Sequence, residues 1–236
     1  MIGVVDVPET GSGIDVFESG LILPIPATEK NTILMEDRDG NSVQRLTASA
    51  VVFQVGGRTV MKDRKIKIDL FVTDARFALA CSKYDKGGGW MGSPGTMVAA
   101  NAISKARAAM RSRGKMLVGQ VRYPWIQKVG CSPKTGWASE EQLIFHETAK
   151  GGAAVLTLTL PKDVDSTLAA AEIIRRVARY RLTNEELDAS TREQLERLAE
   201  AEPSDAIASG EKERYFTIPS PRFVDEESAR IAPAMA

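Results

Sequence analysis

Apolar and polar positions alternate most clearly in two segments, 66–73 and 76–83, which lie on either side of Thr73-Asp74-Ala75. In the first segment every second residue is apolar, as expected for a strand with one buried face: Ile66, Ile68, Leu70 and Val72. The second segment repeats this pattern with Phe77, Leu79 and Cys81. Together the two segments predict a tight antiparallel hairpin.

Other segments rich in β-branched and aromatic residues are also predicted to be strands. They are Ala50–Val55, Met116–Val121, Trp125–Val129, Gln142–Glu147 and Ala153–Leu160. Gly56-Gly57 follows the first of them, and the turns between the last three are predicted at Cys131–Gly136 and 150–152.

Helical periodicity marks other parts of the chain. Met97–Arg113 has apolar residues at spacings of four, three and four, and Gly114 follows it as an expected C-terminal cap. Leu168–Leu182 predicts an amphipathic helix that starts near Asp165 or Ser166. Its predicted buried stripe is Ala170, Ile173, Ile174 and Val177, and the residues expected to face water are Arg175, Arg176 and Arg179.

A further helix is predicted after this one. Thr183 and Glu186 are in capping-box register, which predicts a helix start at Thr183. We expect this helix to run to about Ala201, shortly before Pro203.

The order of these elements is similar to that of the PH-like domain superfamily, in its GRAM-like and bacterial PH branches. The segments that carry the resemblance are Leu70–Leu79, Tyr123–Val129 and Ala171–Tyr180. The first is similar to the family's strand–turn–strand, with Thr-Asp at the turn and Arg just after it. The resemblance implies an α+β fold, in which an antiparallel β-barrel of about seven strands is capped by a C-terminal amphipathic helix.

The resemblance and the local patterns together predict a division of the chain. Residues 43–182 are expected to form the PH-like domain, with the helix at 97–113 as a basic insertion that a minimal domain lacks. Residues 1–42 carry several prolines and are expected to be an N-terminal arm laid over the domain. Residues 183–202 are expected to form an acidic helix, and 203–236 a flexible tail in which 215–218 could dock as a strand. Inositol-lipid recognition is not implied, because the family's basic residues between the first two strands have no firm match.

The formal net charge is zero, but the charges are segregated along the chain. Between Asp85 and Glu140 there is no acidic residue, whereas 183–202 is predominantly acidic. Three interpretations remain open. Both segments could be solvated faces, the acidic helix could dock on the basic region within or between subunits, or the basic region could meet an anionic surface.

Candidate catalytic groups are sparse. His146 is the only histidine and is expected on the strand face opposite Leu143 and Phe145. Cys81 and Cys131 fit no metal-ligand or redox spacing, which predicts no metal site, no cofactor and a reducing cytoplasmic setting. The sequence carries no stacking motif for nucleic acid and announces no small-molecule site.

These features predict a non-enzymatic binding or adaptor module that interacts with a protein partner or with itself. The alternative is a peripheral membrane module in which the basic inserted helix binds acidic lipid. The residues predicted to contact a partner or an anionic surface are Lys105, Arg107, Arg111, Arg113, Lys115 and Trp137.

Overall fold

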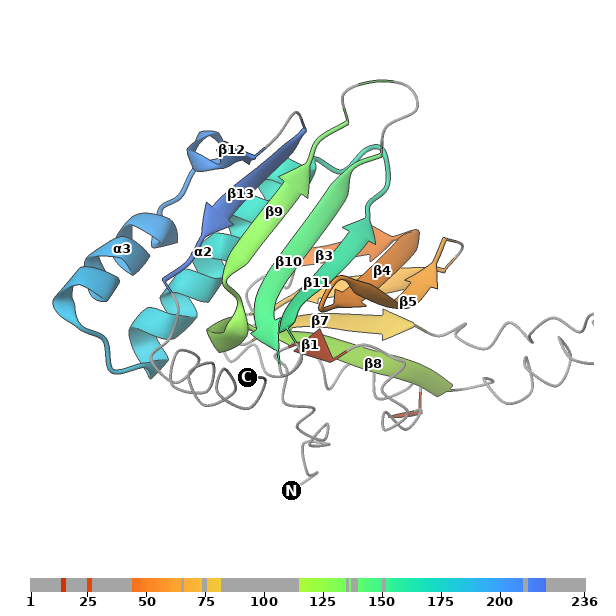
Figure 1. Ribbon diagram of the computed structural model, residues 1–236, viewed down its shortest axis with the longest axis horizontal. Coiled ribbons are helices and arrows are strands. Elements are labelled where there is room, and N and C mark those ends of the chain that lie inside the picture. Colours follow the sequence, from red (N-terminus) through yellow and green to blue (C-terminus); the bar gives the residue numbers. More distant parts are fainter. Residues whose placement is uncertain are drawn as a thin grey trace, which may run out of the picture.

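The computed structural model describes residues 14–15, 25–26, 44–64, 66–73, 76–81, 115–134, 136, 140–149, 152–209 and 212–219. These residues form two antiparallel sheets and two α-helices, so the fold is α+β (Figure 1). The predicted helix at 97–113 lies outside the described residues.

The first sheet has the strand order β1-β8-β7-β6-β3, and β2 pairs with β8 as well. Its strands are β1 (Ile14–Asp15), β2 (Ile25–Pro26), β3 (Gln44–Ala48), β6 (Ile68–Val72), β7 (Arg76–Cys81) and β8 (Lys115–Arg122). Leu70 of β6 pairs with Leu79 of β7, which confirms the predicted hairpin. Two short pieces of the expected N-terminal arm, β1 and β2, pair with β8.

The second sheet has the strand order β12-β13-β9-β10-β11-β4-β5. Its strands are β4 (Ala50–Val55), β5 (Arg58–Asp63), β9 (Lys128–Ser132), β10 (Gln142–Ala149), β11 (Gly152–Thr159), β12 (Ile207–Ser209) and β13 (Glu213–Thr217). Gly56 and Gly57 join β4 to β5 with φ angles of 55° and 74°. A tight two-residue hairpin turn of this kind requires positive φ at both positions, which only glycine adopts without strain.

The helices are α2 (Ser166–Asn184) and α3 (Ala189–Ala199). Asp165 starts α2 by accepting hydrogen bonds from the backbone N–H groups of Thr167 and Leu168. The predicted stripe of α2 is confirmed, because Ala170, Ile173, Ile174 and Val177 are all completely buried.

The core lies between the inner faces of the two sheets and is extended by α2. Phe77 of the first sheet and Phe145 of the second place their ring centroids 4.7 Å apart. Tyr123, in the 3-10 helix η2 (Tyr123–Trp125), donates a hydrogen bond to the backbone oxygen of Thr73 and packs edge-on against Tyr180 of α2. Figure 1 shows α2 behind the second sheet and α3 outside α2, and α2 contacts both β9 and β13.

The described strands do not close into the single barrel that was expected. Within the described strands the pairing of each sheet runs in an open order, with β3 at one end of the first sheet and β12 and β5 at the two ends of the second. The strands therefore form two open sheets that face each other, and the single closed barrel is not seen.

Some predicted boundaries were wrong for local reasons. The strand expected at Trp125–Val129 begins only at Lys128, because Pro124 is at the start of η2 and has no backbone N–H to pair in a strand. Thr183 does not start a helix, since it lies inside α2 and donates a side-chain hydrogen bond to the backbone oxygen of Arg179. The cap of α3 is Asp188, which accepts from the N–H of Thr191 at 2.9 Å.

The segment expected to be a flexible tail contributes to the second sheet. β12 and β13 both lie within residues 203–236, and Phe216 and Ile218 are buried in the core. The strand suggested by residues 215–218 is thus confirmed as part of β13, which pairs with β9.

Candidate functional site

Of the predicted contact residues, only the backbone of Lys115 lies within the described part of the chain. Lys115 is the first residue of β8 and pairs with Pro26 through the backbone, but its side chain lies outside the described part. The other predicted contact residues are outside it too: Lys105, Arg107, Arg111, Arg113 and Trp137. The basic surface that they were expected to form stays a prediction.

A Cys–His catalytic pair is not formed by Cys131 and His146. Cys131 pairs with Leu143 and points into the core, where it contacts Thr167 Oγ1 at 3.7 Å. Burial raises the pKa of the Cys131 thiol, which disfavours the reactive thiolate. His146 lies on the opposite side of the same sheet. Among the described residues there is also no cluster of His, Cys, Asp and Glu that could hold a metal ion.

The second sheet has a side that faces away from the core, and we call it the outer face. Its side chains form three rows of cross-strand neighbours. The central row, from β5 to β12, is Lys62, Val52, Thr157, Ile144, Gly130, Tyr215 and Ile207. The row on one side is Gln54, Val155, His146, Lys128 and Thr217, and the row on the other is Ala50, Thr159, Gln142 and Ser132.

The centre of the outer face carries no charge. In β4, β11 and β10, the described side chains on this face are aliphatic, hydroxyl, amide or imidazole groups: Ala50, Val52, Gln54, Ala153, Val155, Thr157, Thr159, Gln142, Ile144 and His146. The charged residues stand nearer the margins, with Lys62 on β5, Lys128 on β9 and Glu213 on β13. Solvent-facing sides of antiparallel sheets ordinarily alternate to polar residues, and here polar and aliphatic groups are mixed without any charged side chain at the centre.

Two aromatic rings cover the middle of the central row. His146 and Tyr215 are edge to face, with ring centroids 5.2 Å apart. The Tyr215 ring lies directly over Gly130, where an added Cβ would come within 2.6 Å of Tyr215 Cδ1. The missing side chain at Gly130 therefore makes the space for the ring, and Ile144 beside it is only 4% exposed.

Electrostatic effects keep this pair of rings neutral. Burial raises the pKa of Tyr215, and so does the hydrogen bond that its hydroxyl donates to Glu213 Oε2 at 2.5 Å. Burial lowers the pKa of His146 below 6.5, and the nearby Lys128 lowers it further, against the opposing influence of Glu213. Both effects favour an uncharged surface at neutral pH.

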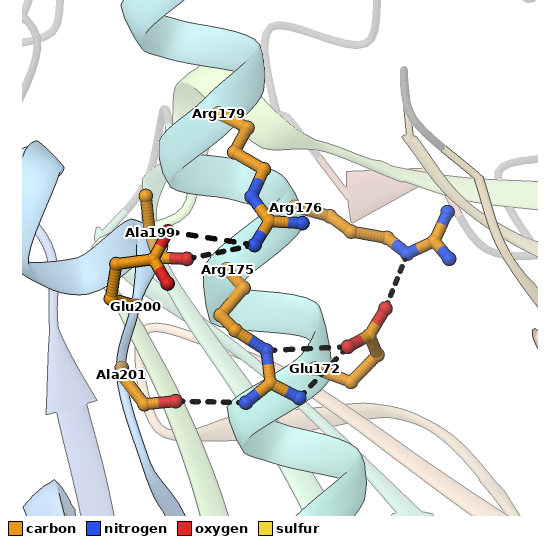
Figure 2. A network of polar contacts seen from close by, with 7 residues as sticks. All are labelled: Glu172, Arg175, Arg176, Arg179, Ala199, Glu200 and Ala201. Carbon is orange, nitrogen blue, oxygen red and sulfur yellow. Dashed lines mark hydrogen bonds and ion pairs between the residues drawn. The ribbon is translucent and has the colours of Figure 1, made fainter.

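On the opposite side of the molecule, Arg175 and Arg179 of α2 hold the C-terminal end of α3 in place, and Arg176 binds Glu172 within α2 (Figure 2). Arg175 donates to the backbone oxygen of Ala201 at 2.9 Å, and Arg179 donates to that of Ala199 at 3.1 Å. The last carbonyls of a helix have no intrahelical partner and carry partial negative charge, which cations stabilise. The acidic helix is thus anchored on α2. The interpretation in which it docks on the basic region concerns residues outside the described part.

The prediction that all three of these arginines face water was therefore wrong in part. Glu172 accepts from Arg175 and Arg176 at 2.9 and 2.8 Å, and neither arginine is fully exposed. Burial alone would raise the pKa of Glu172, but the hydrogen bonds from Arg176 and Arg175 outweigh it and hold that pKa below 4.5. This network fixes the back of the domain and leaves the outer face as the candidate functional site.

Sequence reasoning missed the outer face, although part of its signal was present. The alternate positions of three predicted strands lack charge, but only the pairing of the strands shows that these positions adjoin.

Among the described residues no helix is both long and apolar enough to cross a membrane. Comparison of the chain with models of protein families, with curated proteins and with solved structures finds no match.

Proposed function

We propose that this chain is a non-enzymatic binding module that holds a protein partner on the outer face of its second sheet. The observation that carries the proposal is the uncharged centre of this face, framed by Lys62, Lys128 and Glu213. Depletion of charge at the core of a patch, with tyrosine present and polar residues around it, is the composition that distinguishes protein interfaces from other surface.

The outer face is held rigid by the packed core beneath it, as a preformed binding surface requires. The inner side of the same strands is packed in the core, where Leu143, Phe145 and Leu156 are completely buried. Gly130 and Tyr215 interlock on the outer side, so the central surface is set before a partner arrives. A face that is already ordered loses less entropy on binding than a loop would.

The relationship to the PH-like superfamily is part of the same proposal. Its support is the order of antiparallel strands followed by one amphipathic helix, α2, that packs against the second sheet. Under this proposal the two open sheets are a PH-like core, to which β12 and β13 add strands beyond β9.

A capture experiment tests the proposal. The tagged full-length chain, the variant Thr157→Arg and the control Gln194→Arg would each be cross-linked in lysate of the source cells. Thr157 lies at the centre of the outer face, whereas Gln194 is exposed on α3 behind the sheet. Both variants add one positive charge, so a general effect of charge is controlled.

We expect the wild-type chain and Gln194→Arg to capture the same defined proteins, and Thr157→Arg to lose them by about tenfold or more, because a buried unpaired charge opposes binding. Circular dichroism and thermal melting would verify that each variant is folded. If a folded Thr157→Arg variant captures the same proteins in the same amounts, the outer face is not the binding surface.

A further inference from the structure

We propose that the partner on the outer face is a second copy of this chain, related to the first by a two-fold axis parallel to the strands. This inference rests on the proposed function, since it names the partner for the same face. It follows from the register of the rows, from the positions of the charges and from the size of the face.

A two-fold interface uses the same patch on both copies, so the patch must be complementary to itself. When two identical sheets face each other across a two-fold axis parallel to their strands, the strand order of one is reversed over the other. β10 stands at the middle of the order β12-β13-β9-β10-β11-β4-β5, and it therefore lies over β10 of the second copy. The remaining strands lie opposite one another in pairs, β11 with β9, β4 with β13, and β5 with β12.

The central row is complementary to itself in this arrangement. Val52 of one copy comes opposite Tyr215 of the other, and Thr157 comes opposite Gly130. An aliphatic group thus meets an aromatic residue, and the small hydroxyl group of Thr157 meets the place where the Tyr215 ring lies over Gly130. Ile207 of β12, which is 71% exposed, lies at the end of the row and comes opposite Lys62 of β5, whose aliphatic stem can pack on it.

The charged residues at the margins of the outer face favour a two-fold axis parallel to the strands over one perpendicular to them. Lys62 is exposed on β5 at one margin, and Glu213 is exposed on β13 near the other. An axis parallel to the strands places Lys62 of each copy over Ile207 of its partner, one strand and one row from Glu213, so opposite charges lie near each other at both margins. An axis perpendicular to the strands would place Lys62 over Lys62, and like charges across an interface suppress association.

The size of the face predicts a weak dimer. Twist makes two packed sheets meet mainly over their central strands. Five strands about 4.8 Å apart, each in contact over about six residues of about 3.4 Å, offer roughly 500 Å² per copy. The total of about 1,000 Å² is at the low end for a specific interface, so we expect dimers that form at tens to hundreds of micromolar and dissociate on dilution.

Sedimentation equilibrium of the full chain between about 10 and 500 µM tests this. We expect the average mass of the wild type to rise with concentration from that of one chain toward that of two, and Thr157→Arg to stay monomeric. Lys62→Glu should weaken dimerisation about tenfold, and so should Glu213→Lys, although the latter also removes the acceptor of the Tyr215 hydroxyl. The double variant restores the charge pairing and should dimerise more strongly than Glu213→Lys alone. Lys67→Glu, which changes an exposed lysine just before β6 in the first sheet, is the matched control and should dimerise as the wild type does.

Two results would overturn the inference in different ways. A wild-type chain that remains monomeric at 500 µM excludes the second copy, and if Thr157→Arg still abolishes capture from lysate, the proposed function stands with another protein as partner. A dimer whose stability is not restored in the double variant excludes the axis parallel to the strands. A dimer that persists unchanged in the folded Thr157→Arg variant excludes the outer face as its interface.

Discussion

The contact between Gly130 and Tyr215 makes a quantitative prediction about the substitution Gly130→Ala. A Cβ on residue 130 would lie 2.6 Å from Tyr215 Cδ1 and 3.2 Å from Cζ, so the ring or the strand must move. The backbone itself does not forbid alanine, because Gly130 is not among the glycines with positive φ. Any loss of unfolding free energy in Gly130→Ala therefore reports the clash with the Tyr215 ring.

Its magnitude can be worked out from the contacts of Tyr215. Displacing the ring weakens its hydrogen bond to Glu213, worth about 0.5–1 kcal/mol at this partly exposed site, and its contact with His146, worth about 0.5–1.5 kcal/mol. Retaining the ring instead strains the strand by about 1–3 kcal/mol. Alanine recovers about 0.5–1 kcal/mol relative to glycine inside a strand. We expect a net loss of about 1 kcal/mol, and hence a Tm lower by about 2–4 °C for a chain of this size.

Urea unfolding followed by circular dichroism would measure the loss, with Tyr215→Ala as the second arm of a double-mutant cycle. Without the ring, Gly130→Ala should become neutral or stabilising by up to about 1 kcal/mol. Gly136→Ala is the matched control, because no atom lies within 4 Å of the Cβ that it adds, and it should leave stability nearly unchanged. An equal loss with and without Tyr215 would refute the reasoning, since the ring could then not be its cause.

Two further predictions concern buried charge and pH. Arg181 has a side chain only 1% exposed, is 2.8 Å from Glu185 and donates to the backbone oxygen of Pro219. We expect Arg181→Met to lower the free energy of unfolding, measured in urea, by about 3 kcal/mol or more, because Glu185 is left without its partner. The added change Glu185→Leu should recover much of this loss. If it recovers none, the loss comes from packing and not from the unpaired charge. His146 has a pKa below 6.5 because of burial and the nearby Lys128, so the unfolded chain binds its proton more readily than the folded chain. Its contribution to stability is thus present above pH 6.5 and lost as pH falls through the folded-state pKa. His146→Gln should therefore reduce the loss of unfolding free energy between pH 7.5 and 5, measured by urea unfolding. An NMR titration of this single histidine that gives a pKa at or above 6.5 would contradict the prediction.

Local elements were predictable where the pattern itself contains the physics. Alternation fixed the hairpin of β6 and β7, since one buried face forces every second residue to be apolar. Gly56-Gly57 marked the turn after β4, and Asp165 marked the start of α2. These features depend on residues within a few positions of one another, so the chain need not be folded for them to be recognised.

The outer face is different, because it joins residues far apart in the sequence. Val52, Ile144 and Tyr215 become near neighbours only when β4, β10 and β13 take their places in one sheet. Likewise, periodicity showed which side of α2 is buried. It gave no sign that α3 would fold back so that Arg179 binds its last carbonyl and Arg175 binds the carbonyl of Ala201 just beyond its end.

The sequence by itself determined the hairpin of β6 and β7, the turn after β4 and the buried side of α2, because these depend on short-range periodicity and local turn and cap residues. Tertiary structure alone decided the open arrangement of the two sheets, the addition of β12 and β13 at one edge and the assembly of an uncharged surface. The physical reason is that strand pairing is a contact between distant segments, and its register, absent from any local pattern, sets which side chains become neighbours.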